Sequence, residues 1–375
     1  MQISDTYISN FRNLKPRRLR WCLGLNLLTG INGSGKTNML EALNVACGWG
    51  SFYNASATEL RTWDTRAIEG KTGNIEIFCE AVGEEQVSVE ISISSRISAK
   101  VNKERVSLSE LRTYIPALCF LPGDMNIIDG TPAVRRVFVD KICTILSIPY
   151  AKRLSDYKRL IRHRIKLLRI GKSPTVTSHL ISSIGSWIWS IRSSVVKMLN
   201  EYVSIEGSSK LSPFPLKLSH KPGGNAENNE TYEEAPRITK SDLLERLEFY
   251  SERELKVKAP LAGPHRDDIL ISVSGNKEKH LGALSPASAL SRGQKKRAVV
   301  SLLLASGRIL QSRLKRKPIF LLDEVFSELD EEARHIVATA LYETGWQIFA
   351  SSAENNLSDW RGKVFNLCDG YVVTN

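Results

Sequence analysis

The chain has 375 residues, of which 42% are hydrophobic and 25% charged, and a chain of this kind can bury one large core or form two domains. Lysine and arginine outnumber aspartate and glutamate by 52 to 40, which gives a formal net charge of +12 and favours a polyanionic partner. The six cysteines form no C-x-x-C pair, so a zinc site and structural disulfides are disfavoured and a reducing, cytoplasmic location is expected. We expect neither a membrane span nor a secretory signal, because no apolar run is long enough for a span and no signal-like core follows the first residues.

The first informative motif is a predicted phosphate-binding loop, Gly30-Ile31-Asn32-Gly33-Ser34-Gly35-Lys36-Thr37. It lies between a short apolar strand at 25–29 and a helix with apolar periodicity, which is the context that the pattern G-x-x-x-x-G-K-[ST] requires. Glycines let the backbone curl so that successive N–H groups face phosphate oxygens, and the helix N-terminus adds its positive end. We therefore expect Lys36 to reach the β- and γ-phosphates of a nucleotide and Thr37 to bind Mg²⁺. The alternative, a glycine-rich turn that binds nothing, does not account for this context.

Next along the chain, the segments 75–79 and 87–93 alternate apolar and polar residues, as half-buried strands do. A turn signal at 82–85 separates them and predicts a β-hairpin, which the segment 101–106 would extend into a meander. Residues 1–120 are therefore predicted to form the N-terminal part of a nucleotide-binding head.

Residues 121–257 are predicted to form a mainly helical arm domain. Its first long helix carries apolar residues at three- and four-residue spacing: Tyr150, Leu154, Tyr157, Ile161, Ile165 and Leu168. A second long helix around 181–195 would pack on the first, and 241–255 is helical again. The segment 219–237 is rich in glycine, asparagine and glutamate, and we predict a flexible insertion there. No heptad pattern is long enough for an extended coiled coil.

Basic residues cluster in three segments, and each could contact DNA phosphates without reading sequence. The first segment is 12–20 and the third is 313–317. The second lies on the first long arm helix, where between Lys152 and Lys172 the only acid is Asp156. Its candidate DNA contacts are Lys152, Arg153, Lys158, Arg159, Arg162 and Arg164, with Lys166 and Arg169 beyond them. The alternative for each segment is a solvated helix face or loop.

The C-terminal part of the head, residues 258–375, carries two more motifs. Leu290-Ser291-Arg292-Gly293-Gln294 precedes a helical pattern and offers a hydroxyl and free N–H groups at a helix start, although an ordinary N-cap is an equal alternative. Farther on, the apolar strand 319–322 ends in Asp323 and Glu324. The carboxyl end of such a strand is where α/β sheets bind ligands, so we expect Asp323 to hold Mg²⁺ and Glu324 to polarise the attacking water.

Together these motifs resemble the RecF family of bacterial recombination mediators, whose head is of the ABC and SMC ATPase type. The resemblance covers the chain from end to end and rests on these segments in order: 8–14, 32–38 with 40–42, Ser51-Phe52, 130–132 with Arg135, Arg136 and Asp140, Gly263 to Asp268, the signature-like 290–294, and Leu321 to Asp330. The resemblance implies an α/β P-loop NTPase fold of the ABC/SMC-head type with an antiparallel β subdomain and a helical arm.

The resemblance also implies roles for further residues. Asn38 would join the nucleotide site, and Ser291, Gly293 and Gln294 would complete the site of a partner chain in an ATP-dependent homodimer. Ser327 and Asp330 would lie in the loop at the dimer interface. Ser351-Ser352 falls where such ATPases carry a γ-phosphate sensor.

By the same resemblance, the implied function is a weak, DNA-dependent ATPase of DNA repair, replication, recombination and the SOS response. It would use ATP and Mg²⁺, bind duplex DNA and single-strand/duplex junctions, and support RecA loading at gaps with RecR and RecO. Two alternatives remain open: an SMC-like ATPase that acts on a protein or RNA, and a nucleotide-switched scaffold whose hydrolysis is vestigial.

Some residues depart from the family pattern or allow two interpretations. Arg292 stands where the family usually has glutamine, Tyr53 where an arginine is usual, and Gly123 where an acid is expected. Arg61 could replace the arginine missing at Tyr53. Arg135 and Arg136 could equally pair with Asp140 or Asp124, and His265 and Arg266 could form a buried network or a functional contact.

Overall fold

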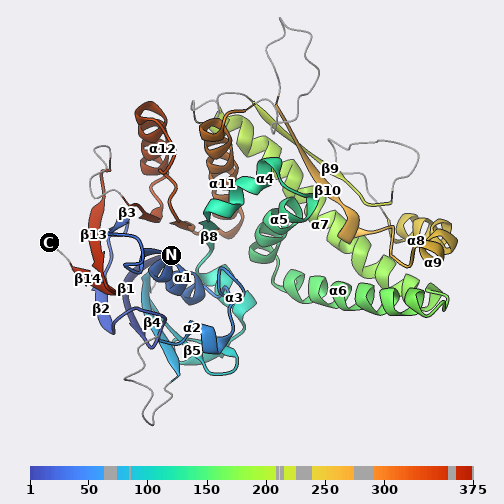
Figure 1. Cartoon of the computed structure of the whole chain (residues 1–375), viewed down its shortest axis with the longest axis horizontal. Helices are drawn as coiled ribbons and strands as arrows, with labels where there is room; N and C mark the ends of the chain where they lie inside the picture. Colours follow the sequence, from blue (N-terminus) through green and yellow to red (C-terminus); the bar gives the residue numbers. More distant parts are fainter. Residues whose placement is uncertain are drawn as a thin grey trace, which may run out of the picture. The chain divides into compact units, whose positions relative to one another are not determined.

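The computed structural model describes residues 1–62, 74–83, 86–207, 211, 215–224, 239–273, 290–353 and 360–373. The chain divides into two compact units, one of Met1–Asp124 with Leu310–Asn375 and one of Met125–Ile309 (Figure 1). The predicted division differs from this one in the C-terminal half, because residues 258–309 group with the helical unit rather than with the head. The predicted domain boundaries stay predictions.

The first unit contains an antiparallel six-stranded sheet in the order β2-β1-β4-β5-β6-β7. Its strands are β1 (Gln2–Ser9), β2 (Arg17–Arg20), β4 (Ile75–Val82), β5 (Gln86–Ile93), β6 (Ile97–Val101) and β7 (Glu104–Val106). The predicted hairpin and its extension into a meander are therefore confirmed, while Glu84 and Glu85 of the predicted turn lie outside the described residues. Alternate residues of β4 and β5 are buried, as expected for a sheet with one face on the core.

A second six-stranded sheet of this unit has the order β14-β13-β3-β12-β11-β8. Its strands are β3 (Leu25–Thr29), β8 (Ala117–Phe120), β11 (Ile319–Leu322), β12 (Gln347–Ser351), β13 (Lys363–Cys368) and β14 (Tyr371–Val373). All pairings are parallel except that of β13 with β14. Every residue of the central strands β3, β11 and β12 is buried, which is typical of parallel strands covered on both faces.

The helices of the first unit include α1, which packs against strands of both sheets. They are α1 (Lys36–Ala46), α2 (Ala57–Leu60), α3 (Leu108–Tyr114) and α12 (Glu331–Glu343). Because β3 and β11 are parallel, the phosphate loop after β3 and the acids after β11 lie at the same edge of the sheet. Strand β12 lies between β3 and β11, so its last residue, Ser351, falls between the two motifs.

The second unit is mainly helical (Figure 1). Its elements are α4 (Asn126–Asp129), α5 (Pro132–Leu146), α6 (Ile148–Arg169), α7 (Thr175–Gly207), β9 (Leu216–Lys221), α8 (Lys240–Phe249), α9 (Ser251–Val257) and β10 (Asp268–Val273). Helix α11 (Arg292–Leu314) begins in this unit and ends in the other. The two predicted long helices are confirmed as α6 and α7, which pack on each other.

Two expectations for this unit are wrong in detail. The predicted insertion at 219–237 starts inside a strand, because Ser219, His220 and Lys221 belong to β9 and pair with β10; residues 225–237 lie outside the described residues. A strand partner more than 45 residues away could not be read from local composition. The predicted helix at 241–255 is two helices, α8 and α9, which meet at Tyr250.

Candidate functional site

The phosphate loop forms a tight curl between β3 and α1. Gly30, Gly33 and Gly35 have φ angles of 141°, 84° and 109°, which L side chains rarely adopt. A side chain at Gly30 would also overlap the carbonyl oxygen of Leu367 on β13. Helix α1 starts at Lys36, so the N–H groups of its first turn have no partner within the helix. The sequence pattern thus gives the strand–loop–helix geometry that was predicted.

Lys36 and Ser34 hold their polar groups within this curl. The Lys36 ammonium donates to the carbonyl oxygens of Gly30 at 2.7 Å and Ile31 at 3.0 Å. Burial lowers the pKa of Lys36, while the nearby Glu324 and Asp323 carboxylates act in the opposite direction. The Ser34 hydroxyl is buried and has no hydrogen-bond partner within the described parts of the chain. A buried orphan hydroxyl beside an ammonium and free N–H groups suits an anionic ligand with acceptor oxygens.

Asp323 stands opposite the end of the phosphate loop. Its two carboxylate oxygens lie 3.1 and 3.0 Å from the Thr37 hydroxyl, so the two predicted Mg²⁺ ligands lie side by side. Their role in binding Mg²⁺ stays a prediction. The Ser351 hydroxyl donates to the Asp323 carboxylate at 2.6 Å and accepts from the Glu324 N–H at 2.9 Å. Ser351 therefore fixes both acids at once, from the strand between them.

Glu324 has a left-handed backbone conformation, with φ of 51°. Such a conformation costs about 1–2 kcal/mol outside glycine and persists where surrounding contacts enforce it. Besides the bond from its N–H to Ser351, the Glu324 carbonyl accepts from the Ser327 hydroxyl at 2.8 Å. These two contacts hold the Glu324 backbone in this conformation.

The site residues fit a nucleoside triphosphate with Mg²⁺. Thr37 and Asp323 provide hard oxygen ligands, which Mg²⁺ prefers. Within the described residues no cluster of three or more histidines, cysteines or acids could hold a metal ion alone. Mg²⁺ in such sites is bound by one or two protein groups together with phosphates and waters, which matches the short protein ligand set here.

Three other predicted ligand residues make contacts within the chain. Asn38 donates its amide to the Asn13 side chain at 2.7 Å. Ser327 bonds the Glu324 carbonyl as described above. Asp330 is the N-cap of α12 and accepts from the Ala333 N–H at 2.8 Å. Their predicted roles in nucleotide binding or at a dimer interface stay predictions.

The signature-like loop belongs to the second unit and forms a capping box at the start of α11. The Gln294 side chain accepts from the Ser291 N–H at 2.9 Å, and the Ser291 hydroxyl accepts from the Gln294 N–H at 3.3 Å. This is the N-cap alternative of the sequence analysis. Ser291 is nonetheless exposed and Gly293 half-buried, so the predicted contact of both with a partner chain's nucleotide stays a prediction.

Tyr53, one of the departures from the family pattern, lies beside the site. Glu41 on α1 is paired with Arg12 and accepts from the Ser51 hydroxyl and the Phe52 N–H. Glu41 follows Thr37 by one helical turn. Its contacts with Ser51 and Phe52 therefore hold the segment that leads into Tyr53 on the same face of α1 as Thr37. Burial raises the pKa of Tyr53, with Asp323 and Glu41 adding to the increase.

The basic residues of α6 divide into two groups. Lys152, Arg153, Lys158, Arg159 and Arg162 are exposed, although Arg153 stacks over Trp187 and Arg159 pairs with Asp156 at 2.6 Å. The prediction of Arg164 as a DNA contact is wrong, because the side chain is completely buried and its Nη2 lies 2.7 Å from the Glu254 carboxylate. The other two basic segments are partly engaged. In the first, Arg12 pairs with Glu41 and Arg18 with Glu80, and in the third, Arg316 donates to the Thr113 carbonyl.

The segment 263–268 forms a buried network in the second unit. Arg192 of α7 joins Asp140 at 2.9 Å and Asp267 at 2.7 Å. Of the two residues with two interpretations, His265 bonds the Tyr157 hydroxyl, whereas Arg266 is exposed and donates to the Pro260 carbonyl. A functional contact of these two residues stays a prediction. Arg135 pairs with Asp268, and Arg136 donates to the Asp267 carbonyl, so their partners differ from Asp140 and Asp124, which one of the two interpretations gave.

A Ser193–His220–Asp267 chain of hydrogen bonds, 2.7 and 3.0 Å long, lies in the same network. The three residue types are those of a nucleophilic triad. All three side chains are buried, with exposures of 4% or less, so no substrate can reach the serine. The arrangement is therefore part of the core and not a second active site.

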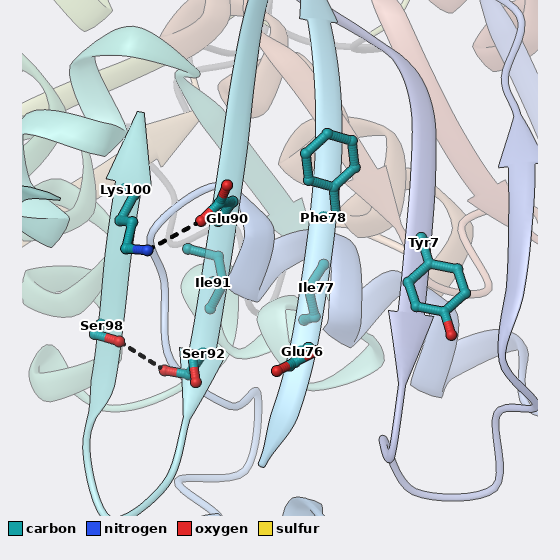
Figure 2. A pocket seen from close by; sticks show the side chains of 9 residues that line it. All are labelled: Tyr7, Glu76, Ile77, Phe78, Glu90, Ile91, Ser92, Ser98 and Lys100. Atoms are coloured by element: carbon teal, nitrogen blue, oxygen red, sulfur yellow. Dashed lines mark hydrogen bonds and ion pairs between the residues drawn. The ribbon is translucent and has the colours of Figure 1, made fainter. Parts of the chain in front are cut away.

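A shallow pocket of about 400 Å³ lies on the outer face of the antiparallel sheet (Figure 2). Tyr7, Phe78, Glu90 and Lys100 lie opposite one another across four neighbouring strands, and Lys100 pairs with Glu90 at 3.3 Å. Ile77 and Ile91 also line it and are almost fully buried (Figure 2), and no residue of the phosphate loop belongs to the lining. The pocket and the phosphate loop are therefore separate sites.

The fold and site define a P-loop NTPase head of the ABC and SMC type. The family described as RecF/RecN/SMC N terminal domain matches residues 2–367, and the chain belongs to this family. Among the described helices, none is long and apolar enough to cross a membrane.

Individual relatives point to one branch of this family. The chain is 26% identical to the DNA replication and repair protein RecF of Caldanaerobacter subterraneus subsp. tengcongensis, over the full length of both. It is 29% identical to the protein of the same name from Shewanella pealeana, over all of this chain and 99% of the relative.

Solved structures agree with this placement. A structure of the recombination mediator protein RecF-ATP in the RecFOR pathway matches with a TM-score of 0.81 and 25% identity, covering 100% of this chain and 97% of that one. An Smc head bound to the C-terminal winged-helix domain of ScpA matches with a TM-score of 0.56 and 15% identity, covering 99% and 96%, and it supports the fold alone. The resemblance to RecF and the predicted fold class are confirmed.

Proposed function

We propose that this chain is an ATP-binding and ATP-hydrolysing protein of DNA replication and repair. The observation that carries the proposal is the assembly of Lys36, Thr37, Asp323 and Ser351 at one sheet edge, with Glu324 following Asp323. Full-length similarity to proteins named DNA replication and repair protein RecF supports it, as does the similarity to a RecF-ATP structure.

In the proposed reaction, the phosphate loop and Lys36 bind the nucleotide phosphates and stabilise the charge that develops on them. Thr37 and Asp323 would hold Mg²⁺, which would neutralise further charge on the phosphates. Glu324 acts as the general base for the attacking water. Its backbone, fixed by Ser351 and Ser327, positions the carboxylate before the reaction begins, so no reorganisation is needed during the step.

The proposal includes an ATP-dependent homodimer. Two chains close head to tail so that Ser291, Gly293 and Gln294 of one face the nucleotide of the other, with Ser327 and Asp330 near the contact. The exposure of Ser291 at the N-terminus of α11 supports this role, because helix N-termini bind anions.

Duplex and gapped DNA is the proposed polyanionic partner, and ATPase activity is proposed to be slow and DNA-dependent. The exposed basic residues of α6 are the proposed contacts, now without Arg164. The protein would act in the cytoplasm, with RecR and RecO, to support RecA loading at single-strand gaps. These partners follow from the similarity to RecF alone.

A first experiment measures duplex-DNA binding by fluorescence anisotropy with ATP, with ADP, and with Lys36→Met plus ATP. Binding that requires ATP and is lost in the variant supports the coupling of nucleotide and DNA sites. Equal binding in all three conditions would contradict it.

A pair of double variants tests the DNA surface. Lys158→Glu with Arg162→Glu should weaken DNA binding and lower the salt dependence of the binding constant by about two phosphate contacts. The exposed pair Arg96→Glu with Arg105→Glu on the antiparallel sheet should change neither.

A second experiment tests hydrolysis and dimerisation together. Glu324→Gln retains the shape of the side chain but removes the base, so ATP should be bound and not hydrolysed. Light scattering should then detect a stable dimer with ATP and a monomer without it. A variant that hydrolyses ATP at the wild-type rate would exclude Glu324 as the base.

A further inference from the structure

The C-terminal hairpin β13–β14 contacts the phosphate loop, although no motif lies in it. Its turn is Asp369-Gly370, with φ angles of 45° and 80°, between the paired residues Cys368 and Tyr371. Two central residues with positive φ are typical of a type I′ turn, for which Asp-Gly is a preferred sequence. The sequence of the turn therefore favours the conformation that it adopts.

The Gly370 backbone forms hydrogen bonds with the phosphate loop and with the segment before β2. Its N–H donates to the carbonyl oxygen of Ser34 at 3.0 Å, and its carbonyl accepts from the Lys15 N–H at 3.0 Å. The same hairpin approaches the start of the loop at Gly30, which faces the Leu367 carbonyl without room for a side chain. The loop is therefore supported by the hairpin at its first glycine and at the residue before Gly35.

Asn13 supports the loop from a second direction. Its amide donates to the Gly33 carbonyl at 3.2 Å, and its amide oxygen accepts from Asn38 in the first turn of α1 at 2.7 Å. One side chain thus links the tip of the loop to the helix. Gly370 packs against the Asn13 backbone so closely that a Cβ there would overlap the Asn13 carbonyl oxygen.

We propose that the Asp369-Gly370 turn and Asn13 are positioning elements of the nucleotide site, which hold the phosphate loop in its curled, phosphate-binding shape. The proposal rests on the proposed function, since it concerns the same site. The loop N–H groups bind phosphate well only when they already point inward, because an unsupported loop loses conformational freedom on binding. Loss of the support should therefore weaken ATP binding and leave turnover at saturating ATP little changed.

The test compares Gly370→Ala with Gly345→Ala. Both glycines have positive φ, 80° and 62°, so both variants carry similar backbone strain. At Gly345, however, the added Cβ would meet nothing closer than the Lys317 ammonium at 3.8 Å. We expect Gly370→Ala to raise the Kd for fluorescently labelled ATP and the KM of hydrolysis roughly tenfold, with kcat within about twofold. Gly345→Ala should bind ATP as the wild type does.

Asn13→Ala provides the second variant, since it leaves the turn intact and removes only the bonds to Gly33 and Asn38. It should reproduce the loss of ATP affinity even where Gly370→Ala unfolds the hairpin. Wild-type affinity in Asn13→Ala, or equal affinities in Gly370→Ala and Gly345→Ala, would overturn the proposal. Failure of the proposed function gives a different result: the wild type itself would bind ATP no better than Lys36→Met.

Discussion

Ser351 illustrates how a single hydroxyl can set the geometry of two acids. It donates to Asp323 and accepts from the Glu324 N–H, so its removal takes away one hydrogen bond from each acid and leaves both less restrained. We expect Ser351→Ala to lower kcat for ATP roughly tenfold, because a misplaced base and metal ligand affect the transition state more than substrate binding. The Kd for ATP should change less than about twofold.

Steady-state hydrolysis and equilibrium ATP binding together measure this prediction. Ser9→Ala is a suitable control, because the Ser9 hydroxyl bonds a strand carbonyl in the other sheet. Wild-type turnover in Ser351→Ala would show that the two acids are positioned without this hydroxyl.

His265 predicts a pH dependence of stability. Burial lowers its pKa from 6.5 to about 4, and its Nδ1 lies 2.8 Å from the Tyr157 hydroxyl. Between these pH values the unfolded chain binds more protons at this site than the folded chain. The contribution of His265 to stability is therefore complete above pH 6.5 and is lost as the pH falls toward 4.

Urea unfolding between pH 7.5 and 4.5 measures this effect. His265→Gln should flatten the fall in unfolding free energy across this interval, while His163→Gln, at an exposed position of α6, should not. Asp267, whose pKa lies below 3.8 because His220 and Arg192 outweigh the effect of burial, affects stability only at lower pH. Equal slopes for the wild type and His265→Gln would contradict the assignment.

At the scale of elements, helix α6 has a basic face and a buried face, and one arginine lies on the buried side. Arg164 donates to Glu254 of α9 and, through Nη1, to Pro174, Thr177 and Ser178. Arg164→Ala should destabilise the chain by about 3–5 kcal/mol, since it leaves the buried Glu254 carboxylate unpaired.

Urea denaturation and DNA binding separate the two faces of α6. Arg164→Ala should lower the unfolding midpoint and retain DNA affinity at temperatures where it is folded. Arg162→Ala should show the reverse pattern. A folded Arg164→Ala protein with selectively weakened DNA binding would mean that this side chain reaches DNA after all.

At the scale of the whole molecule, the two units are stabilised by different means. The first contains a large hydrophobic cluster that joins α1 to both sheets, whereas the second buries the ion pairs of Arg192 and Arg164. Because the nucleotide residues belong to the first unit, ATP should stabilise the transition in which that unit unfolds. At about 100-fold excess over Kd the gain is roughly 2.7 kcal/mol.

Differential scanning calorimetry with and without ATP and Mg²⁺ measures this gain. The wild type should show a higher melting temperature for at least one transition with ATP, and Lys36→Met should show no change. An equal shift in both proteins would mean that ATP binds elsewhere on the chain.

The sequence by itself determined the elements whose signals are local. The phosphate loop, the apolar strands 25–29 and 319–322, the alternating hairpin and the stripe of α6 each follow from spacing within a few residues. Charge and spacing alone do not indicate which basic residues are exposed. The basic run predicts Arg164 as a DNA contact, whereas its partner Glu254 is 90 residues away in the sequence. A local pattern does not contain such a partner.

Only the tertiary structure decided how distant segments meet at the site. Ser351 lies between Thr37 and Asp323 because β12 inserts between β3 and β11 in the sheet order, and Gly370 reaches Ser34 because β13 pairs with β3. The Asp-Gly dipeptide of this turn indicates a hairpin, but nothing in the sequence states what the hairpin touches. Strand order is set by packing across the whole sheet, whereas the chemistry of each motif is set by its own residues. The sequence therefore indicates the candidate site, and the fold shows which residues support it.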